Sequence, residues 1–119
     1  MSISASVTLI NKTGSAIKIT QCSHVNDDAT FSGISVGDVI ENGSSEKLKM
    51  GNSSVFFAPR GCGCDISFIC QSNFEIGNIV FDDPAVGAHS FSFGNTEVFA
   101  YTPGGDTSNS DYTVTVSLI

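Results

Sequence analysis

The sequence predicts an all-β protein, an antiparallel two-sheet β-sandwich formed by a single domain over residues 1–119. Three observations predict it. Apolar and polar residues alternate at period two in almost every apolar segment, no segment sustains the 3.6-residue period of a helix, and turn-forming residues separate short segments at regular spacing. A chain of 119 residues is long enough to bury a core as one domain.

The N-terminal segment predicts a β-hairpin. Ala5, Val7 and Leu9 alternate with serine and threonine, and a second alternating run begins at Ile17. Between them stands Asn11-Lys12-Thr13-Gly14, in which Gly14 can supply the positive φ of a tight turn. We therefore expect the two runs to pair with each other.

The rest of the chain reads as a series of short strands. In residues 64–70, Cys64, Ile66, Phe68 and Cys70 share one face, which we expect to be buried. Breakers such as Asn42-Gly43, Gly94-Asn95 and Pro103-Gly104-Gly105-Asp106 separate the candidates. The candidate strands are 31–34, 38–40, 47–50, 55–58, 64–70, 76–81, 90–93, 96–102 and 112–118.

The charge balance argues against nucleic acid binding and against purely electrostatic docking onto an anionic membrane. The net charge is −7, and the only fixed cations are Lys12, Lys18, Lys47, Lys49 and Arg60, which are spread along the chain. Such a chain would be repelled by a nucleic acid. Its few basic residues would give only weak electrostatic attraction to an anionic membrane. Contact with a membrane would have to come from recognition of a lipid or from exposed aromatic residues.

The four cysteines leave three readings open. Cys62-Gly63-Cys64 could supply two zinc ligands, but the second closely spaced pair of a structural zinc site is missing. Because Cys64 and Cys70 share the predicted core face, we favour free core thiols for Cys22, Cys62, Cys64 and Cys70, with one disulfide or a metal site as the alternatives. We predict no metal.

The sequence also contains no specific motif for calcium binding or for catalysis. Asp27-Asp28 and Asp82-Asp83 could offer oxygen ligands to calcium, but no EF-hand spacing is present. Only His24 and His89 could act as bases at neutral pH, and neither sits in a nucleophile motif. We therefore predict no enzymatic activity, no catalytic residue and no cofactor.

Aromatic residues provide the candidate binding surface. Phe91 and Phe93 alternate with serines in 90–93, and Phe99 and Tyr101 alternate with Val98 and Ala100. If the Val98 face of that strand is core, Phe99 and Tyr101 form a partly exposed strip. Such a strip packs under a loop or contacts a lipid or sugar.

Three segments of the chain form an ordered pattern. They are the strand and turn Val7-Thr8-Leu9-Ile10-Asn11-Lys12-Thr13-Gly14, the stretch from Gly77 to Gly87 with Phe81-Asp82-Asp83-Pro84, and the closing Gly104-Gly105 and Tyr112-Thr113-Val114-Thr115-Val116. In this order they resemble the aegerolysin family of small lipid-binding, toxin-associated β-sandwich proteins. The likeness runs from about Val7 to Leu118, and the second stretch is most similar to the small component of binary insecticidal crystal proteins of bacilli.

The resemblance implies an acidic protein that binds a membrane lipid and acts with a larger pore-forming partner protein. From this resemblance we expect the chain to be the membrane-lipid-binding small subunit of a two-component pore-forming system, cytolytic or insecticidal. The expected lipid-binding residues come from two places. Phe81, Asp82 and Asp83 occupy the aromatic-Asp-x-Pro position of the family, and Phe99 and Tyr101 form the aromatic strip.

The chain also departs from the family. It has no Trp, Phe81 stands where a Trp often precedes the aspartate, and the loop at Arg60-Gly61-Cys62-Gly63 lacks an acidic residue. The lipid specificity of the fungal members is therefore not implied.

The remaining expectations concern location and rival functions. Residues 1–20 lack a basic region followed by an apolar run, so we expect synthesis in the cytoplasm without a classical signal peptide, and action outside the cell at target membranes. The rivals are a lectin-like carbohydrate-binding sandwich and a structural adhesion module. A homo-oligomer remains an open alternative.

Overall fold

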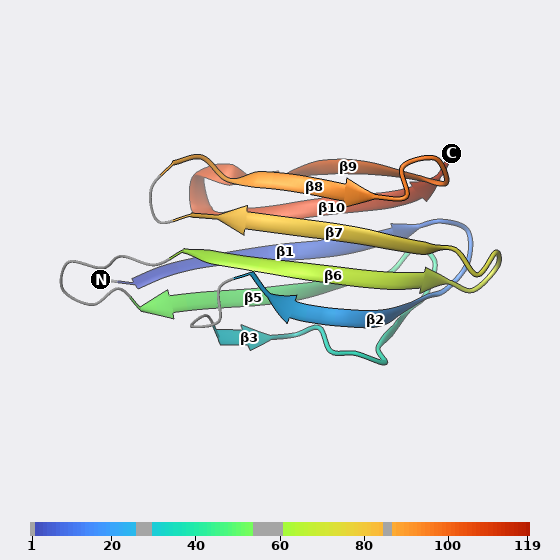
Figure 1. The fold of residues 1–119 in the computed structure, drawn as a ribbon, viewed down its shortest axis with the longest axis horizontal. Coiled ribbons are helices and arrows are strands. Elements are labelled where there is room, and N and C mark those ends of the chain that lie inside the picture. Colours follow the sequence, from blue (N-terminus) through green and yellow to red (C-terminus); the bar gives the residue numbers. More distant parts are fainter. Residues whose placement is uncertain (1, 26–29, 54–60, 85–86) are drawn as a thin grey trace.

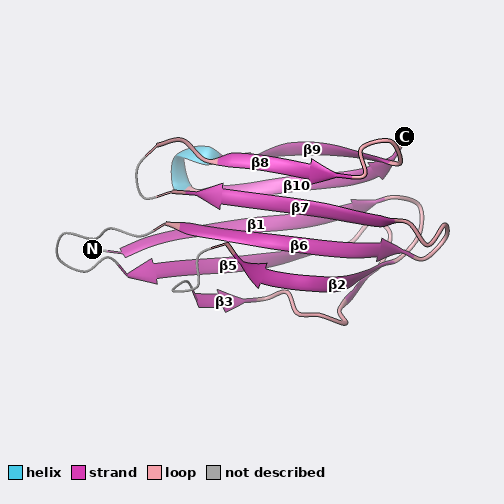
Figure 2. Ribbon diagram, viewed as in Figure 1, coloured by secondary structure: helices cyan, strands magenta, loops and turns pink. Residues whose placement is uncertain are grey.

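Two five-stranded β-sheets pack face to face in the computed structural model, which describes residues 2–25, 30–53, 61–84 and 87–119 (Figures 1 and 2). The predicted all-β sandwich is thereby confirmed. The first sheet has the order β3 (Thr30–Ser32), β5 (Ser45–Ser53), β1 (Ser2–Lys12), β10 (Asp111–Leu118) and β9 (Phe99–Asp106). The second has the order β4 (Val39–Ile40), β2 (Ile17–His24), β6 (Cys62–Cys70), β7 (Ile76–Asp83) and β8 (Ser90–Gly94).

The core lies between the two sheets and follows the alternation seen in the sequence. In β6, Cys64, Ile66, Phe68 and Cys70 are all buried, while Asp65 turns to the other face. The predicted core face of this strand is therefore confirmed. The molecule is elongated along the strands, with extents of 48 × 24 × 21 Å.

The predicted N-terminal hairpin is wrong, because β1 and β2 belong to different sheets. β1 lies in the middle of the first sheet, antiparallel to β5 and parallel to β10, with Val7 opposite Tyr112. β2 pairs instead with β4 and β6. β1 and β2 each have one apolar face. Because the two strands lie in opposite sheets, both apolar faces point into the core between the sheets.

The turn between β1 and β2 is organised by the buried side chain of Asn11. Its Nδ2 donates to the carbonyl oxygens of Ser15 (2.7 Å) and Ile40 (2.8 Å). Its Oδ1 accepts from the backbone N–H (3.0 Å) and the hydroxyl (2.7 Å) of Thr13. The Asn-Lys-Thr-Gly segment is thus a corner that carries the chain from one sheet to the other.

Strand β9 differs from its prediction at both ends. It begins at Phe99, and it continues through Pro103-Gly104-Gly105-Asp106, which we expected to break it. β9 is an edge strand, where a proline can be accommodated without disrupting an inner ladder. Gly105 has φ +98°, and a Cβ there would lie 2.4 Å from the carbonyl oxygen of Asp111. The candidate strand 55–58 lies outside the described residues.

Within the described ranges, no helix is long and apolar enough to cross a bilayer. The one helical segment in the part of the chain that the structure describes is a short 3-10 turn at Thr107–Asn109, which connects β9 to β10 (Figure 2).

Candidate functional site

Phe81 and Phe99, two of the residues predicted to bind lipid, are core residues. Their side chains are 0% and 1% exposed. The Phe81 ring lies 4.9 Å from that of Tyr112, and the Phe99 ring lies 5.2 Å from that of Phe68. The expectation that Phe99 lies on the face opposite the core is therefore wrong. Alternation divided this strand into two faces correctly, but both faces carry apolar residues, so it did not show which face points inward.

Tyr101 is half-buried and bridges the two sheets. Its hydroxyl donates to the carbonyl oxygen of Gly94 (2.6 Å) and accepts from the backbone N–H of Asn78 (3.2 Å). Its ring is stacked on that of Phe93, with centroids 4.6 Å apart. Burial raises the pKa of its phenol. These contacts give Tyr101 a structural role at the edge of the sandwich.

Partly exposed rings line the junction between edge strands β8 and β9, which we call the aromatic seam: His89, Phe91, Phe93 and Tyr101. Successive ring centroids are 6.0 Å apart for His89 and Phe91, and 5.8 Å for Phe91 and Phe93. The Ser-Phe-Ser-Phe alternation in 90–93 indicated these phenylalanines, but the prediction placed the binding strip on Phe99 and Tyr101 instead. Along the seam, aromatic surface reaches solvent over two neighbouring edge strands.

Asp82 and Asp83 end strand β7, opposite Ser90 of β8 and Cys62 of β6. Burial raises the pKa of Asp83, while the nearby His89 acts in the opposite direction. Phe81, beside them, contacts Tyr112 near the start of β10, whereas Phe99 pairs with Leu118 at the end of β10. The five predicted residues therefore do not form one site.

The structure bears on the three alternatives for the cysteines, which are free thiols, a disulfide and a metal site. Cys22, Cys64 and Cys70 are free thiols, and burial raises the pKa of Cys64 to about 12. Among the described residues, no group of three or more His, Cys, Asp or Glu side chains could hold a metal ion. Asp27 and Asp28, considered for calcium, lie outside the described residues.

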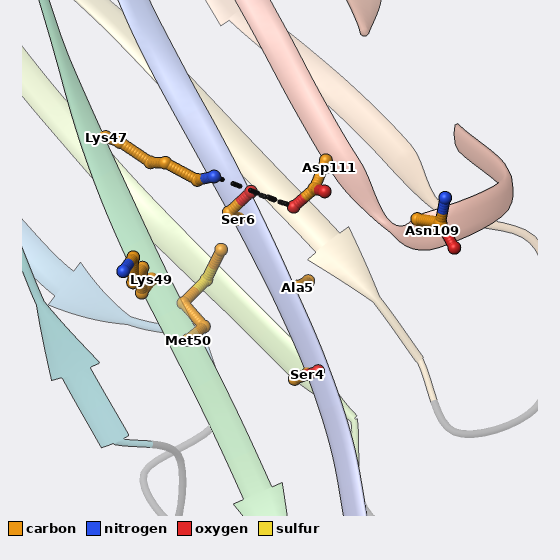
Figure 3. Close-up of a pocket in the computed structure, with 8 residues that line it drawn as sticks. All are labelled: Ser4, Ala5, Ser6, Lys47, Lys49, Met50, Asn109 and Asp111. Atoms are coloured by element: carbon orange, nitrogen blue, oxygen red, sulfur yellow. Dashed lines mark hydrogen bonds and ion pairs between the residues drawn. The ribbon is translucent and has the colours of Figure 1, made fainter. Parts of the chain in front are cut away.

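A polar hollow lies on the outer face of the first sheet, over β1 and β5 (Figure 3). Its volume is about 190 Å³. Ser6 Oγ donates to Asp111 Oδ1 (2.6 Å), and Lys47 Nζ lies 3.9 Å from the same oxygen. The lining offers hydroxyl, ammonium, amide and carboxylate groups, which suit a small polar ligand. The lining residues are Ser4, Ala5, Ser6, Lys47, Lys49, Met50, Asn109 and Asp111.

An apolar tip lies at the turn between β6 and β7, where Phe74 and Ile76 are exposed. The turn lies at the end of the molecule away from the start of β1 (Figure 1). The sequence prediction did not include either residue. The available signal was an isolated Phe within the polar run Gln71 to Glu75.

The fold and these surfaces define the class: a small all-β sandwich with a polar hollow, an aromatic seam and an apolar tip. Comparison of the chain with models of protein families and with curated proteins found no match.

Proposed function

We propose that the chain is the membrane-lipid-binding small subunit of a two-component pore-forming system, cytolytic or insecticidal. The observation that carries the proposal is the ordered resemblance to aegerolysins from Val7 to Leu118. The all-β sandwich is the fold that this resemblance implies.

The corner at Asn11 supports the weight given to the first segment. A buried amide with two donated and two accepted hydrogen bonds is a demanding feature. An asparagine followed two residues later by threonine satisfies it, because both side chains bond to each other. The likeness therefore includes residues whose side chains hold the corner between the two sheets.

Charge and surface composition support contact with lipid through apolar groups. The chain has net charge −7, so bulk attraction to an anionic surface is weak. Exposed apolar side chains at the tip and partly exposed rings in the seam provide a contact that does not depend on charge.

The test combines binding with permeabilisation. Purified protein is sedimented with vesicles of phosphatidylcholine alone, or mixed with phosphatidylethanolamine, sphingomyelin or phosphatidylserine. Dye release is measured with and without a candidate larger partner, sought first as the product of a neighbouring gene. We expect binding to at least one vesicle type, little release by this chain alone, and release when both proteins are present. Absence of binding to every vesicle type would refute the proposal.

The polar hollow favours carbohydrate binding as the second candidate function. Ser4, Lys49, Asn109 and Asp111 offer the donors and acceptors that sugar hydroxyls need. A glycan array tests this directly. Binding to a glycan that is lost in Asn109→Ala, together with no binding to vesicles, would establish this function in place of the first.

A further inference from the structure

We propose that the apolar tip, Phe74 in the β6–β7 turn and Ile76 at the start of β7, is the part of this protein that enters the membrane interface. The inference rests on the proposed function and names the surface that performs it. Phe74 is 78% exposed and Ile76 is 54% exposed. Placing both in water is unfavourable unless something covers them.

The backbone at Phe74 holds its side chain outward. Phe74 has φ +57°, a left-handed conformation that glycine and asparagine adopt readily and bulky residues rarely adopt. The turn imposes it, because Phe74 N–H donates to Cys70 O (2.9 Å) and Cys70 N–H donates to Glu75 O (2.8 Å). A phenylalanine kept in this conformation while exposed indicates a role outside the folded core.

A neighbouring loop fixes the tip in place. Asn95 Nδ2 donates to the carbonyl oxygen of Ile76 (2.9 Å) and to Glu75 Oε2 (3.2 Å). Asn95 itself has φ +58° and accepts from the backbone N–H of Val98 (3.1 Å). The two apolar side chains are therefore presented by a hydrogen-bonded turn, and little ordering is required when they become covered.

The charge of the turn suits a neutral bilayer. The segment from Gln71 to Ile76 carries one charged side chain, Glu75, whose carboxylate is bonded to Asn95. The other polar residues of the turn are uncharged, and no lysine or arginine lies within it. Insertion would not require an anionic lipid, and it would not be weakened by salt.

The size of the patch favours a bilayer over a protein partner. A stable protein interface buries about 800 Å² on each side. Two side chains on one turn, at the end of a molecule 48 Å long, offer much less area. A bilayer needs only a few apolar side chains at its surface. The C-terminus lies at the same end of the molecule (Figure 1), and its last residue, Ile119, is 78% exposed.

The absence of Trp from the sequence allows a direct measurement. Phe74→Trp places a single indole at the tip, and Val36→Trp places one at a control site that is 63% exposed between β3 and β4. On addition of phosphatidylcholine vesicles, we expect a blue shift and quenching by brominated lipid for Phe74→Trp only. Equal responses from the two variants, or none from Phe74→Trp while the protein sediments with vesicles, would overturn the inference.

A second pair of variants tests the contribution to binding. Phe74→Asn removes the ring and suits the left-handed backbone, so this variant should fold at least as well as the parent. We expect about tenfold weaker partitioning onto phosphatidylcholine vesicles for Phe74→Asn, and unchanged partitioning for the control Val36→Asn. The partitioning of the parent should be the same at low and physiological salt.

The outcomes separate the tip from the wider proposal. If the parent binds no vesicle in the panel, the proposed function and this inference both fail. If it binds vesicles and Phe74→Asn binds equally well, the tip assignment fails while the proposed function stands. If the parent is a dimer in size-exclusion chromatography and Phe74→Asn is a monomer, the tip contacts a second copy and the membrane assignment is overturned.

Discussion

The hydroxyl of Tyr101 donates a 2.6 Å hydrogen bond to the carbonyl oxygen of Gly94 and so joins the two sheets at their edge. Tyr101 belongs to β9 at the edge of the first sheet, and Gly94 ends β8 at the edge of the second. This bond and the stacking of Tyr101 on Phe93 hold the aromatic seam together.

Tyr101→Phe should destabilise the fold modestly. The variant keeps the ring but leaves the carbonyl oxygen of Gly94 and the N–H of Asn78 without this partner. We expect a loss of about 1 kcal/mol in the free energy of unfolding, measured by urea denaturation. Ser92→Ala, at an exposed position on β8, is the control, and an equal effect in both variants would contradict the assigned role.

Phe99→Ala should destabilise much more than Tyr101→Phe. Phe99 is fully surrounded by core, and its removal leaves a cavity beside Phe68. We expect a loss of about 3–5 kcal/mol in the free energy of unfolding. Circular dichroism should therefore be recorded before any binding assay, because weakened vesicle binding in this variant would reflect lost structure. A near-normal unfolding curve would place Phe99 at the surface.

Asn11→Ala should destabilise the corner between the sheets. The substitution leaves the carbonyl oxygen of Ile40 and the N–H of Thr13 buried without their side-chain partners. We expect a loss of at least about 2 kcal/mol in the free energy of unfolding. The adjacent exposed residue provides the control, since Lys12→Ala should change stability by less than about 0.5 kcal/mol. Similar losses in the two variants would refute the role of the amide.

Gly77→Ala should be destabilising because no space exists for its methyl group. A Cβ at Gly77 would lie 2.2 Å from Phe68 Cζ and 2.7 Å from the hydroxyl oxygen of Tyr101. We expect a loss of about 1–3 kcal/mol by thermal or urea unfolding. In the double variant with Phe68→Leu, which removes the nearest atom, the effects should be less than additive. Strict additivity would show that the contact is relieved elsewhere.

The contribution of Glu46 to the free energy of unfolding should be larger in mild acid than at neutral pH. Burial and the neighbouring Asp38 raise the pKa of Glu46, one of whose carboxyl oxygens has no hydrogen-bond partner among the described residues. The folded state therefore holds this proton more tightly than the unfolded state. This contribution to stability is complete below the unfolded pKa of about 4.3 and is lost as the pH rises through the higher folded value.

Glu46→Gln should consequently raise the urea midpoint at neutral pH and reduce its dependence on pH. The control is Glu41→Gln, at an exposed position in the preceding turn. If Glu46→Gln lowers the midpoint at neutral pH, the ionised carboxylate is a stabilising group and the assignment is wrong.

The local pattern of the sequence was sufficient for the fold class and for the orientation of β6. Alternation at period two is visible within each segment. In β6 one face is wholly apolar and the other carries Asp65 and Ser67, so Cys64, Ile66, Phe68 and Cys70 could be placed in the core before any partner strand was known. The charge balance and the absence of a metal or nucleophile motif are likewise properties of the chain itself.

Strand pairing and the facing of β9 were decided only by the tertiary structure. β1 lies parallel to β10, its partner at the far end of the chain, and nothing local to Val7 or Tyr112 specifies this pairing. Phe99 faces inward because the opposite sheet supplies Phe68 at that position. Phe74 became a candidate only when its turn was seen to project from the end of the sandwich. Alternation defines two faces for each strand, but contacts between distant segments determine which face is buried and which turns meet the solvent.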